Sequence, residues 1–238
     1  MIAPNAAAAD SDGVVYWQSS HTFHLYNGGV QEIPNTADIK DFVFNNLRTD
    51  QPYLCWAYYD PKFHEVTFFY VALGASEPEL SVTYDIRGQN WTPNVWSDFP
   101  RAGATKFQHG DTRPYLGGQD GNIYLHEDGH NADGAAIRAS LTLAPFALNE
   151  GAGSFKLDGI RMDVKDQAGD LKVEITAYDT LRGAAIDSAQ ITVTPIDELL
   201  DPRVAGRYMA LTLVSDAVDG TFRLGKPTAF IKDGGARR

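Results

Sequence analysis

The chain has 238 residues, of which 43% are hydrophobic and 21% are charged, a composition typical of a folded globular protein. Its 31 acidic and 20 basic residues give a formal net charge of −11, and this charge disfavours a conventional nucleic-acid-binding protein because it repels phosphate. No apolar stretch approaches the ~18 residues that a membrane-spanning helix needs. The first nine residues lack the positive charge and apolar core of a secretory signal. We therefore expect synthesis in the cytoplasm and no membrane partner.

Charge and aromatic residues divide the chain into two regions. Residues 1–135 contain 17 acidic and 7 basic residues, all six His and all four Trp, whereas residues 136–238 contain 14 acidic and 13 basic residues. The stretch from Asp128 to Ala136 is rich in Gly and Asp, which favour turns over regular structure. These observations predict two domains, 1–135 and 136–238, with a boundary near Ala135.

The first region predicts short strands and one helix. Aromatic and β-branched runs alternate with turn-forming residues, and we expect strands at Val14–Gln18, His21–Tyr26, Leu54–Tyr59, Glu65–Val71, Leu80–Tyr84 and Asn122–His126. Apolar residues spaced three and four apart predict a short amphipathic helix over Ala37–Leu47, with Ile39, Phe42, Val43 and Leu47 on its apolar face.

A weak internal repeat indicates the architecture of this region. Asp12-Gly13-Val14-Val15-Tyr16 recurs as Asp120-Gly121-Asn122-Ile123-Tyr124, and a repeated hairpin of short aromatic strands is typical of propeller blades. A blade takes about 40–50 residues, so 135 residues supply at most three of the roughly four or more that a closed propeller needs. We expect propeller-like blades that are partial, or completed by another chain.

The second region predicts a β-sandwich. Apolar and polar residues alternate over Leu171–Tyr178, and the alternation that begins at Phe155 shifts by one place at Asp158-Gly159, as at a β-bulge. Further strands are expected at Gln190–Thr194, Tyr208–Val214 and Thr221–Leu224. The fold class predicted for the whole chain is all-β: partial propeller-like blades with one short helix, followed by an antiparallel β-sandwich-like domain.

Three motifs resemble metal sites, and in each the local pattern favours a turn or strand. His126-Glu127-Asp128-Gly129-His130 matches the H-E-x-x-H string of zinc peptidases, but that chemistry needs a helix, and Asp-Gly after a strand favours a turn. His21 and His24 are three apart in a predicted strand, so their side chains point to opposite faces. Asp10–Gly13 resembles the start of a calcium loop but lacks its later ligands. We therefore expect no metal and no cofactor.

Catalytic patterns are equally weak. Cys55 lies between Leu54 and Trp56 and is predicted to be a buried small hydrophobe. Glu77 and Glu79 flank a proline in a polar loop, where nothing would separate the pKa values of an acid–base pair. The sequence contains no P-loop, no Gly-x-Ser-x-Gly elbow and no Gly-x-Gly-x-x-Gly. We expect the protein not to be an enzyme.

Landmarks in order along the chain carry a resemblance to a known family. They are Tyr16-Trp17 with Tyr26-Asn27-Gly28-Gly29-Val30, then Glu65–Tyr70 leading to Val82–Asp85 and Trp91, then Asp120–Glu127, and last Asp201–Tyr208 with Phe222–Gly225. In this order they resemble the propeller-bearing structural proteins of tailed-phage virions, especially the tail nozzle or hub proteins, also described as packaged-DNA stabilisation proteins, of short-tailed phages. The chain is similar to the C-terminal part of such an architecture.

The resemblance implies a non-enzymatic virion protein and its partners. It implies a homo-oligomeric ring, six-fold, in the virion tail, where adaptor and fibre proteins are neighbours. DNA leaves through the ring without specific binding, and the negative charge agrees with this because DNA affinity grows with the number of phosphates that Lys or Arg neutralises.

Three arginines near the closing strands are candidate subunit-interface residues: Arg203, Arg207 and Arg223. Arginine suits an interface because its planar guanidinium forms two parallel contacts with a carboxylate. The other interpretation is internal, with Arg203 and Arg207 pairing with Asp197, Asp201 or another surface acid of the same chain.

Two other functions stay open. One is a carbohydrate- or receptor-binding module of a tail fibre or spike, in which Trp91, Trp96 and Tyr115 would stack on sugars. The other is a propeller hydrolase, for which no acid–base or nucleophile constellation was found.

Overall fold

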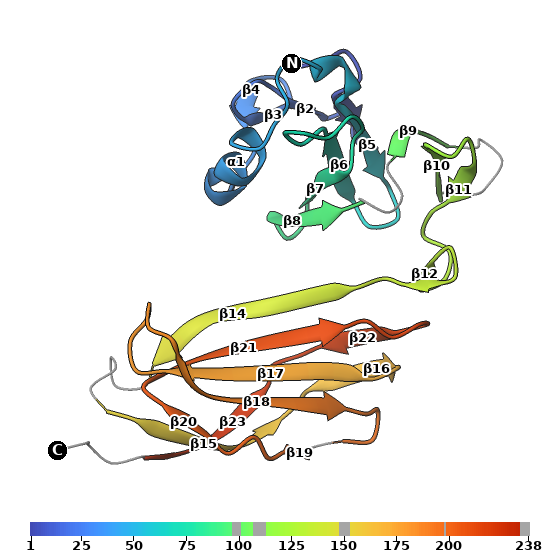
Figure 1. Cartoon of the computed structure of the whole chain (residues 1–238). Helices are drawn as coiled ribbons and strands as arrows, with labels where there is room; N and C mark the ends of the chain where they lie inside the picture. Colours follow the sequence, from blue (N-terminus) through green and yellow to red (C-terminus); the bar gives the residue numbers. More distant parts are fainter. Residues whose placement is uncertain (97–100, 107–112, 148–152, 198, 234–238) are drawn as a thin grey trace. The chain divides into compact units, whose positions relative to one another are not determined.

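The computed structural model describes residues 1–96, 101–106, 113–147, 153–197 and 199–233 (Figure 1). These residues form mostly β-strands in small antiparallel sheets, and the chain divides into two compact units, Met1–Asp128 and Gly129–Arg238. The predicted all-β class is confirmed. The α-helix found in the described residues has only eight residues, and none of their helices is long and apolar enough to cross a membrane.

The first unit consists of three sheets, each an antiparallel meander that follows the chain. The first sheet contains β1 (Ala7–Ala9), β2 (Val15–Gln18), β3 (Phe23–Tyr26) and β4 (Val30–Glu32). The second contains β5 (Trp56–Asp60), β6 (Glu65–Tyr70), β7 (Leu80–Asp85) and β8 (Asn90–Val95). The third contains β9 (Arg101–Lys106), β10 (Pro114–Gly118) and β11 (Ile123–Leu125).

The first strands of successive meanders contact each other, β1 with β5 and β5 with β9. The backbone N–H of Ala57 in β5 also donates to the carbonyl oxygen of Asn5, at 2.8 Å. Adjacent first strands are the arrangement of propeller blades. The three meanders therefore correspond to the predicted partial blades, and over the described residues they do not close into a ring.

The predicted helix ends three residues early. Helix α1 spans Ala37–Phe44, and a short 3₁₀ turn follows at Pro52–Leu54. Leu47 instead forms an antiparallel bridge with Ala72, and the N–H of Arg48 donates to the carbonyl oxygen of Val71 at 2.9 Å. Pairing with the chain after β6 thus replaces the last helical turn. Phe42, expected on the apolar face, is 46% exposed.

Strand β6 explains why the first region is rich in aromatic residues. Its alternate residues Val66, Phe68 and Tyr70 face the core shared with the first sheet and α1, whereas Phe69 faces the third sheet. Phe69 stacks on Trp56 with ring centroids 4.0 Å apart. Since both faces of β6 are covered, apolar side chains fill both sides of one strand, and aromatic rings supply large buried areas there.

The second unit is a sandwich of two four-stranded sheets. One sheet has the order β14 (Ala139–Ala147), β21 (Tyr208–Ser215), β17 (Leu171–Tyr178) and β18 (Ala185–Val193). The other has β15 (Phe155–Arg161) in the middle, with β23 (Thr228–Asp233) on one side and β19 (Leu199–Leu200) and β20 (Val204–Gly206) on the other. A two-stranded ribbon joins β16 (Val164–Ala168) to β22 (Thr221–Leu224).

The alternation predicted for β17 is observed. Leu171, Val173 and Ile175 are buried in the sandwich core, with the intervening residues on the other face of the sheet. The predicted bulge is also present, because the pairing of β15 with β23 shifts register between Leu157 and Gly159. Strand β15 ends at Arg161, and Val164 begins the separate strand β16.

The boundary between the units lies between Asp128 and Gly129, before the expected position at Ala135. The segment expected to be a connection contains a hairpin of β12 (Asn131–Ala132) and β13 (Ala135–Ala136). Asn131 donates to the Asp219 carboxylate at 2.6 Å and accepts from the Asp219 N–H at 2.7 Å. These two bonds attach the hairpin to the second unit.

The core of the first unit should depend strongly on Phe68, which is fully buried with its ring centroid 4.9 Å from that of Phe23. Phe68→Ala should lower the free energy of unfolding by about 3–5 kcal/mol, because it removes buried area and leaves a cavity. The measurement is urea denaturation followed by Trp fluorescence, since all four Trp lie in this unit.

Phe42→Ala is the matched control for this substitution, because Phe42 is 46% exposed. It should change the free energy of unfolding by no more than about 0.5–1 kcal/mol. Equal losses from the two substitutions would contradict the assignment of the core.

Candidate functional site

Arg203 and Arg207 lie on either side of β20. Arg203 is held by Asp201, whose carboxylate oxygens accept from its Nε at 3.0 and 2.9 Å and whose Oδ2 is 2.7 Å from its Nη2. This hydrogen bonding and the charge of Asp201 raise the pKa of the Arg203 guanidinium. The side chain is exposed, so the ion pair forms in solvent. For Arg203 the structure therefore contains the internal pairing that was one of the two alternatives.

A close approach of two strands positions Arg207. At the preceding Gly206, an added Cβ would lie 2.8 Å from the Cβ of Ala177 in β17, so a larger residue would push β20 away. The N–H of Arg207 donates to the carbonyl oxygen of Tyr178 at 3.0 Å. Its side chain is exposed, and within the described part of the chain it forms no ion pair. Arg207 is therefore available to an acid of another molecule.

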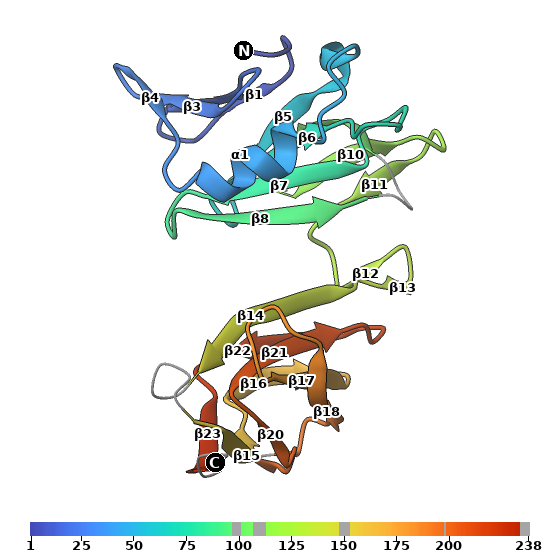
Figure 2. The ribbon, with the colours of Figure 1, turned by 60° about the vertical axis from the view of Figure 1, so that its left-hand side comes forward.

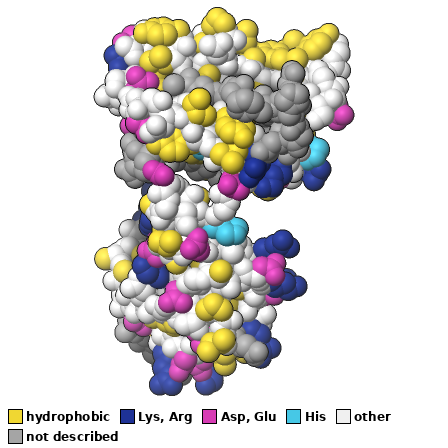
Figure 3. All heavy atoms as spheres, turned by 90° about the vertical axis from the view of Figure 1, so that its right-hand side faces the viewer, with side chains coloured by type: hydrophobic (Ala, Val, Ile, Leu, Met, Phe, Trp, Pro, Cys, Tyr) yellow, Lys and Arg dark blue, Asp and Glu magenta, His cyan; other side chains and the backbone are white. Residues whose placement is uncertain are grey.

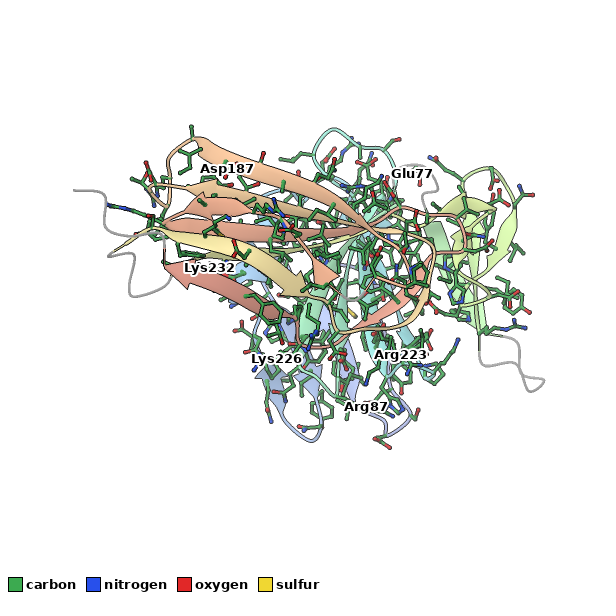
Figure 4. All side chains as sticks on the ribbon, turned by 90° about the horizontal axis from the view of Figure 1, so that it is seen from below. Glu77, Arg87, Asp187, Arg223, Lys226 and Lys232 are labelled. Carbon is green, nitrogen blue, oxygen red and sulfur yellow. The ribbon has the colours of Figure 1, made fainter. Side chains whose placement is uncertain are left out.

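Arg223 belongs to a different sheet. It lies in β22, directly opposite Lys165 of β16, and its Nε is 3.3 Å from the carboxylate of Asp166 (Figure 4). Like charges directly opposite each other in a two-stranded ribbon are unfavourable, and Asp166 offsets part of this repulsion. The structure thus places Arg203 and Arg207 around β20 but puts Arg223 on the β16–β22 ribbon. Lys and Arg lie beside Asp and Glu on the face of the second unit in Figure 3.

A row of carboxylates crosses the second sheet of the first unit. Asp60 of β5 is the register partner of Glu65 in β6, and Glu65 is the partner of Asp85 in β7. Glu127, just after β11, adds a fourth charge within electrostatic reach. Burial first, and then the charges of the other three carboxylates, raises the pKa of Glu65. We call these four residues the acidic row.

Sequence reasoning missed the acidic row, although a signal for it existed. The hairpin from Asp60 to Glu65 and the matching lengths of β6 and β7 set a register that aligns their charged ends. Glu127 reaches the row only through tertiary packing, because more than 40 residues separate it from Asp85. Burial and the charge of Asp60 raise the pKa of Glu127, while Lys62 opposes this effect.

Aspartates also organise four hairpin turns of the first unit: Asp10, Asp60, Asp85 and Asp120. In each turn a carboxylate oxygen accepts the backbone N–H of the residue two positions later, at 2.8–3.1 Å. Such local bonds stabilise tight turns. Asp10 and Asp120 also accept a Tyr hydroxyl, from Tyr16 and Tyr124 respectively. The Asp10–Gly13 segment is therefore a turn, as predicted.

The H-E-x-x-H string is not helical. His126 follows β11 directly, and Glu127 and Gly129 have positive φ angles of 61° and 79°. The segment is a turn, as the sequence predicted, and it lacks the helical spacing that brings the ring nitrogens of two histidines to one metal ion in zinc peptidases. Across the described ranges, no group of three or more His, Cys, Asp or Glu side chains could hold a metal ion.

Two further predictions concern Cys55 and the paired histidines. Cys55 is fully buried, as predicted, and burial raises the pKa of its thiol to about 11, which keeps it unreactive at neutral pH. His24 lies in β3 and stacks on Trp17 with ring centroids 5.3 Å apart. His21 was expected in the same strand but precedes it, because β3 begins at Phe23.

Two of the three aromatic residues considered for sugar binding, Trp91 and Trp96, take part in packing, and the third, Tyr115, is half-buried in β10. The Trp91 ring lies 4.9 Å from those of Phe23 and Tyr84, and its Nε1 donates to the carbonyl oxygen of Pro34 at 2.9 Å. Trp96 packs against Phe69 and donates to the Ser81 hydroxyl at 2.9 Å. These two rings close the core and do not form an exposed stacking platform. Comparison of the chain with protein-family models and with curated proteins gives no match.

Glu65→Gln should stabilise the first unit at neutral pH. The raised pKa means that the folded state favours neutral Glu65, so ionisation costs stability as the pH rises through the folded-state pKa. Gln has no charge, and we expect the free energy of unfolding at pH 7 to increase by about 0.5–1 kcal/mol. The gain should shrink as the pH is lowered toward ~4, where Glu65 itself is protonated.

Thermal and urea unfolding across this pH range test the prediction. Glu77→Gln is the control, because it removes the same charge from a loop away from the acidic row. A Glu65→Gln variant that is less stable than the parent at pH 7, or a gain equal to that of Glu77→Gln, would show that the acidic row carries no repulsion.

Proposed function

We propose that this chain is a non-enzymatic structural protein of a phage virion. It is a component of the tail nozzle or hub ring, assembles from identical copies, six in number, and forms part of the conduit through which DNA leaves. Its neighbours are the other tail proteins, adaptor and fibres. The observation that carries the proposal is the open series of blades in the first unit.

An open series of blades favours assembly. Propellers protect their strand edges by radial repetition that closes on itself. In the first unit three meanders lie with their first strands together, the third sheet has three strands where the others have four, and the series does not close over the described residues. The outer sides of the first and last blades therefore need cover from elsewhere. Neighbouring subunits supply it in a ring.

The acidic row supports the role of a conduit. DNA affinity comes mainly from cations that neutralise phosphates, and a wall rich in carboxylates lets a duplex pass without adhering. Asp60 is buried and Glu65 and Asp85 are half-buried, so the row acts on DNA through its electric field, within a region whose net charge is −10 over residues 1–135. The second region carries nearly equal numbers of both signs, which suits contacts between subunits.

Particle mass and shape test the proposal directly. Native mass measurement and electron microscopy of the purified full chain should reveal closed rings of a single stoichiometry. Filter binding should detect no retention of duplex DNA at physiological salt. A protein that stays monomeric at micromolar concentration and above, or that retains DNA, contradicts the proposal.

Arg207→Glu should weaken the ring without unfolding the subunit. An exposed arginine contributes about 0–1 kcal/mol to the stability of its own chain, whereas like charges brought together across an interface cost several kcal/mol. Sedimentation should therefore detect dissociation, while thermal melts stay close to those of the parent. Arg182→Glu is the control, because Arg182 is also exposed but lies in the loop before β18.

Unchanged assembly together with a much lower melting temperature would contradict this role, because Arg207 would then be an internal structural residue. Equal dissociation of the Arg207→Glu and Arg182→Glu variants would indicate a general effect of charge.

A further inference from the structure

The bulge in β15 creates an exposed apolar patch on the outer face of one sheet of the second unit. Leu157 and Ile160 of β15 point into the sandwich core, and the register shift between them leaves Gly159 on the outer face, opposite Phe230 of β23. A Cβ added to Gly159 would lie 3.4 Å from Cδ1 of Leu199 and 3.5 Å from Cδ2 of Phe230, so these two side chains pack over the glycine from neighbouring strands. Leu199 and Phe230 are nevertheless 59% and 42% exposed. We call these two side chains the apolar patch.

Cations flank the apolar patch along β15. Lys156 is the register partner of Lys232 in β23, and one carboxylate, that of Asp158, pairs with both ammonium groups (Figure 4). Like charges directly opposite each other repel, and one carboxylate neutralises only one of the two. At the other end of the patch, the guanidinium carbon of Arg161 lies 5.7 Å from the centroid of the Phe230 ring. The described side chains on this face of β15 and β23 therefore carry three cations and one carboxylate, in a chain whose net charge is −11.

This composition indicates the chemistry of a partner. An apolar centre with aromatic and arginine side chains, surrounded by charge, is typical of protein interfaces. Because the charge around the patch is positive, a matching surface presents an apolar side chain next to carboxylates.

Helix α1 of the first unit presents this combination. Asp38, Asp41 and Phe42 are spaced three and four residues apart, so they lie on one side of the helix, and all three are exposed. Neither aspartate forms an ion pair with another described residue, whereas Lys40 of the same helix pairs with Glu32. Phe42 is 46% exposed, although the helical spacing predicted it on the apolar face. The helix thus exposes an aromatic ring beside two carboxylates that are available to a partner.

We propose that the outer face of β15 and β23 binds α1 of a second copy of the chain. Phe42 packs on the apolar patch, and the two aspartates of the helix face the three cations. The contact joins two different surfaces, and a head-to-tail contact of this kind closes into a ring when the rotation between copies allows it. The inference rests on the proposed function in one respect, that copies of the chain associate, and it names the two surfaces that meet.

Charge and connectivity favour a second copy as the partner. Two copies that each carry a net charge of −11 repel each other, so a contact between them needs opposite charges where they meet, and these two surfaces supply them. The connection from the first unit enters the second unit through the β12–β13 hairpin and β14, and β14 belongs to the other sheet. Strands β15 and β23 lie on the side of the second unit away from β14, and the two sheets are ~10 Å apart (Figure 2). This separation from the point of entry favours α1 of another copy over α1 of the same chain.

Sedimentation velocity of the full chain over a range of concentrations tests the contact. Asp41→Arg and Arg161→Asp each bring like charges together, and each should raise the dissociation constant of the association at least tenfold. Asp12→Arg is the matched control, because Asp12 is also an exposed acid of the first unit but lies in the turn before β2. Thermal melts of the variants should stay close to that of the parent, because the substituted residues are exposed.

A mixture of the two variants provides a second measurement. Each variant keeps one surface intact, so Asp41→Arg and Arg161→Asp together should associate about as tightly as the parent, although neither does so alone. Folded variants that fail to associate when mixed would overturn the inference. A parent that stays single would also overturn it, as would single variants that associate as tightly as Asp12→Arg.

The outcomes separate this inference from the proposed ring. If the parent forms pairs or open chains and both variants dissociate them, the contact stands and the closed ring is wrong. If closed rings persist unchanged in both variants, the ring stands and the contact is wrong.

Discussion

Every strand that ends a sheet carries backbone N–H and C=O groups without partners, and this chain has many such strands because its described sheets contain only two to four strands. The first unit meets part of this demand by placing the first strands of successive meanders together, where the N–H of Ala57 in β5 donates to the carbonyl oxygen of Asn5. In the second unit, the contact between β18 and β20 gives one backbone group a partner, because the Asp187 carboxylate accepts the N–H of Ala205. Where an edge is uncovered, as at β14, apolar side chains lie exposed beside it.

The acidic row is an electrostatic feature of the first unit that has a structural cause. The acidic row results from strand register, which aligns Asp60, Glu65 and Asp85 and then adds Glu127, so that burial and repulsion act on the same groups. Exposed pairs of cations with nearby acids occur in both units, as between Arg48 and Asp50 in the first and between Arg203 and Asp201 in the second. Exposed pairs of this kind contribute little to stability, and their main effect is to set the charge that a surface presents.

The aspartates of the first unit combine a local and a long-range role. Asp60 and Asp85 each hold a hairpin turn through a backbone N–H bond, and the same two residues flank Glu65 in the acidic row. Their carboxylates are held in place by the turns, so they cannot move apart to relieve repulsion. A residue selected for turn geometry thereby also fixes a local negative field. Asp10 and Asp120 also hold hairpin turns, and each accepts a hydrogen bond from a tyrosine hydroxyl, of Tyr16 and Tyr124 respectively. These two aspartates do not belong to the acidic row.

Local patterns determined some elements of this protein, such as β17, but did not predict others, such as β8 and β14. Alternation over Leu171–Tyr178 and the bulge at Gly159 were readable because side chains in a strand change face at every residue. Tertiary structure decided the rest. It ended α1 at Phe44 by pairing Leu47 with Ala72, and it moved the boundary to Asp128 by binding Asn131 to Asp219. It also brought Glu127 to the acidic row and left Arg223 on a different sheet from Arg203. These outcomes depend on which distant segments meet, and periodicity along one strand carries no information about its partner.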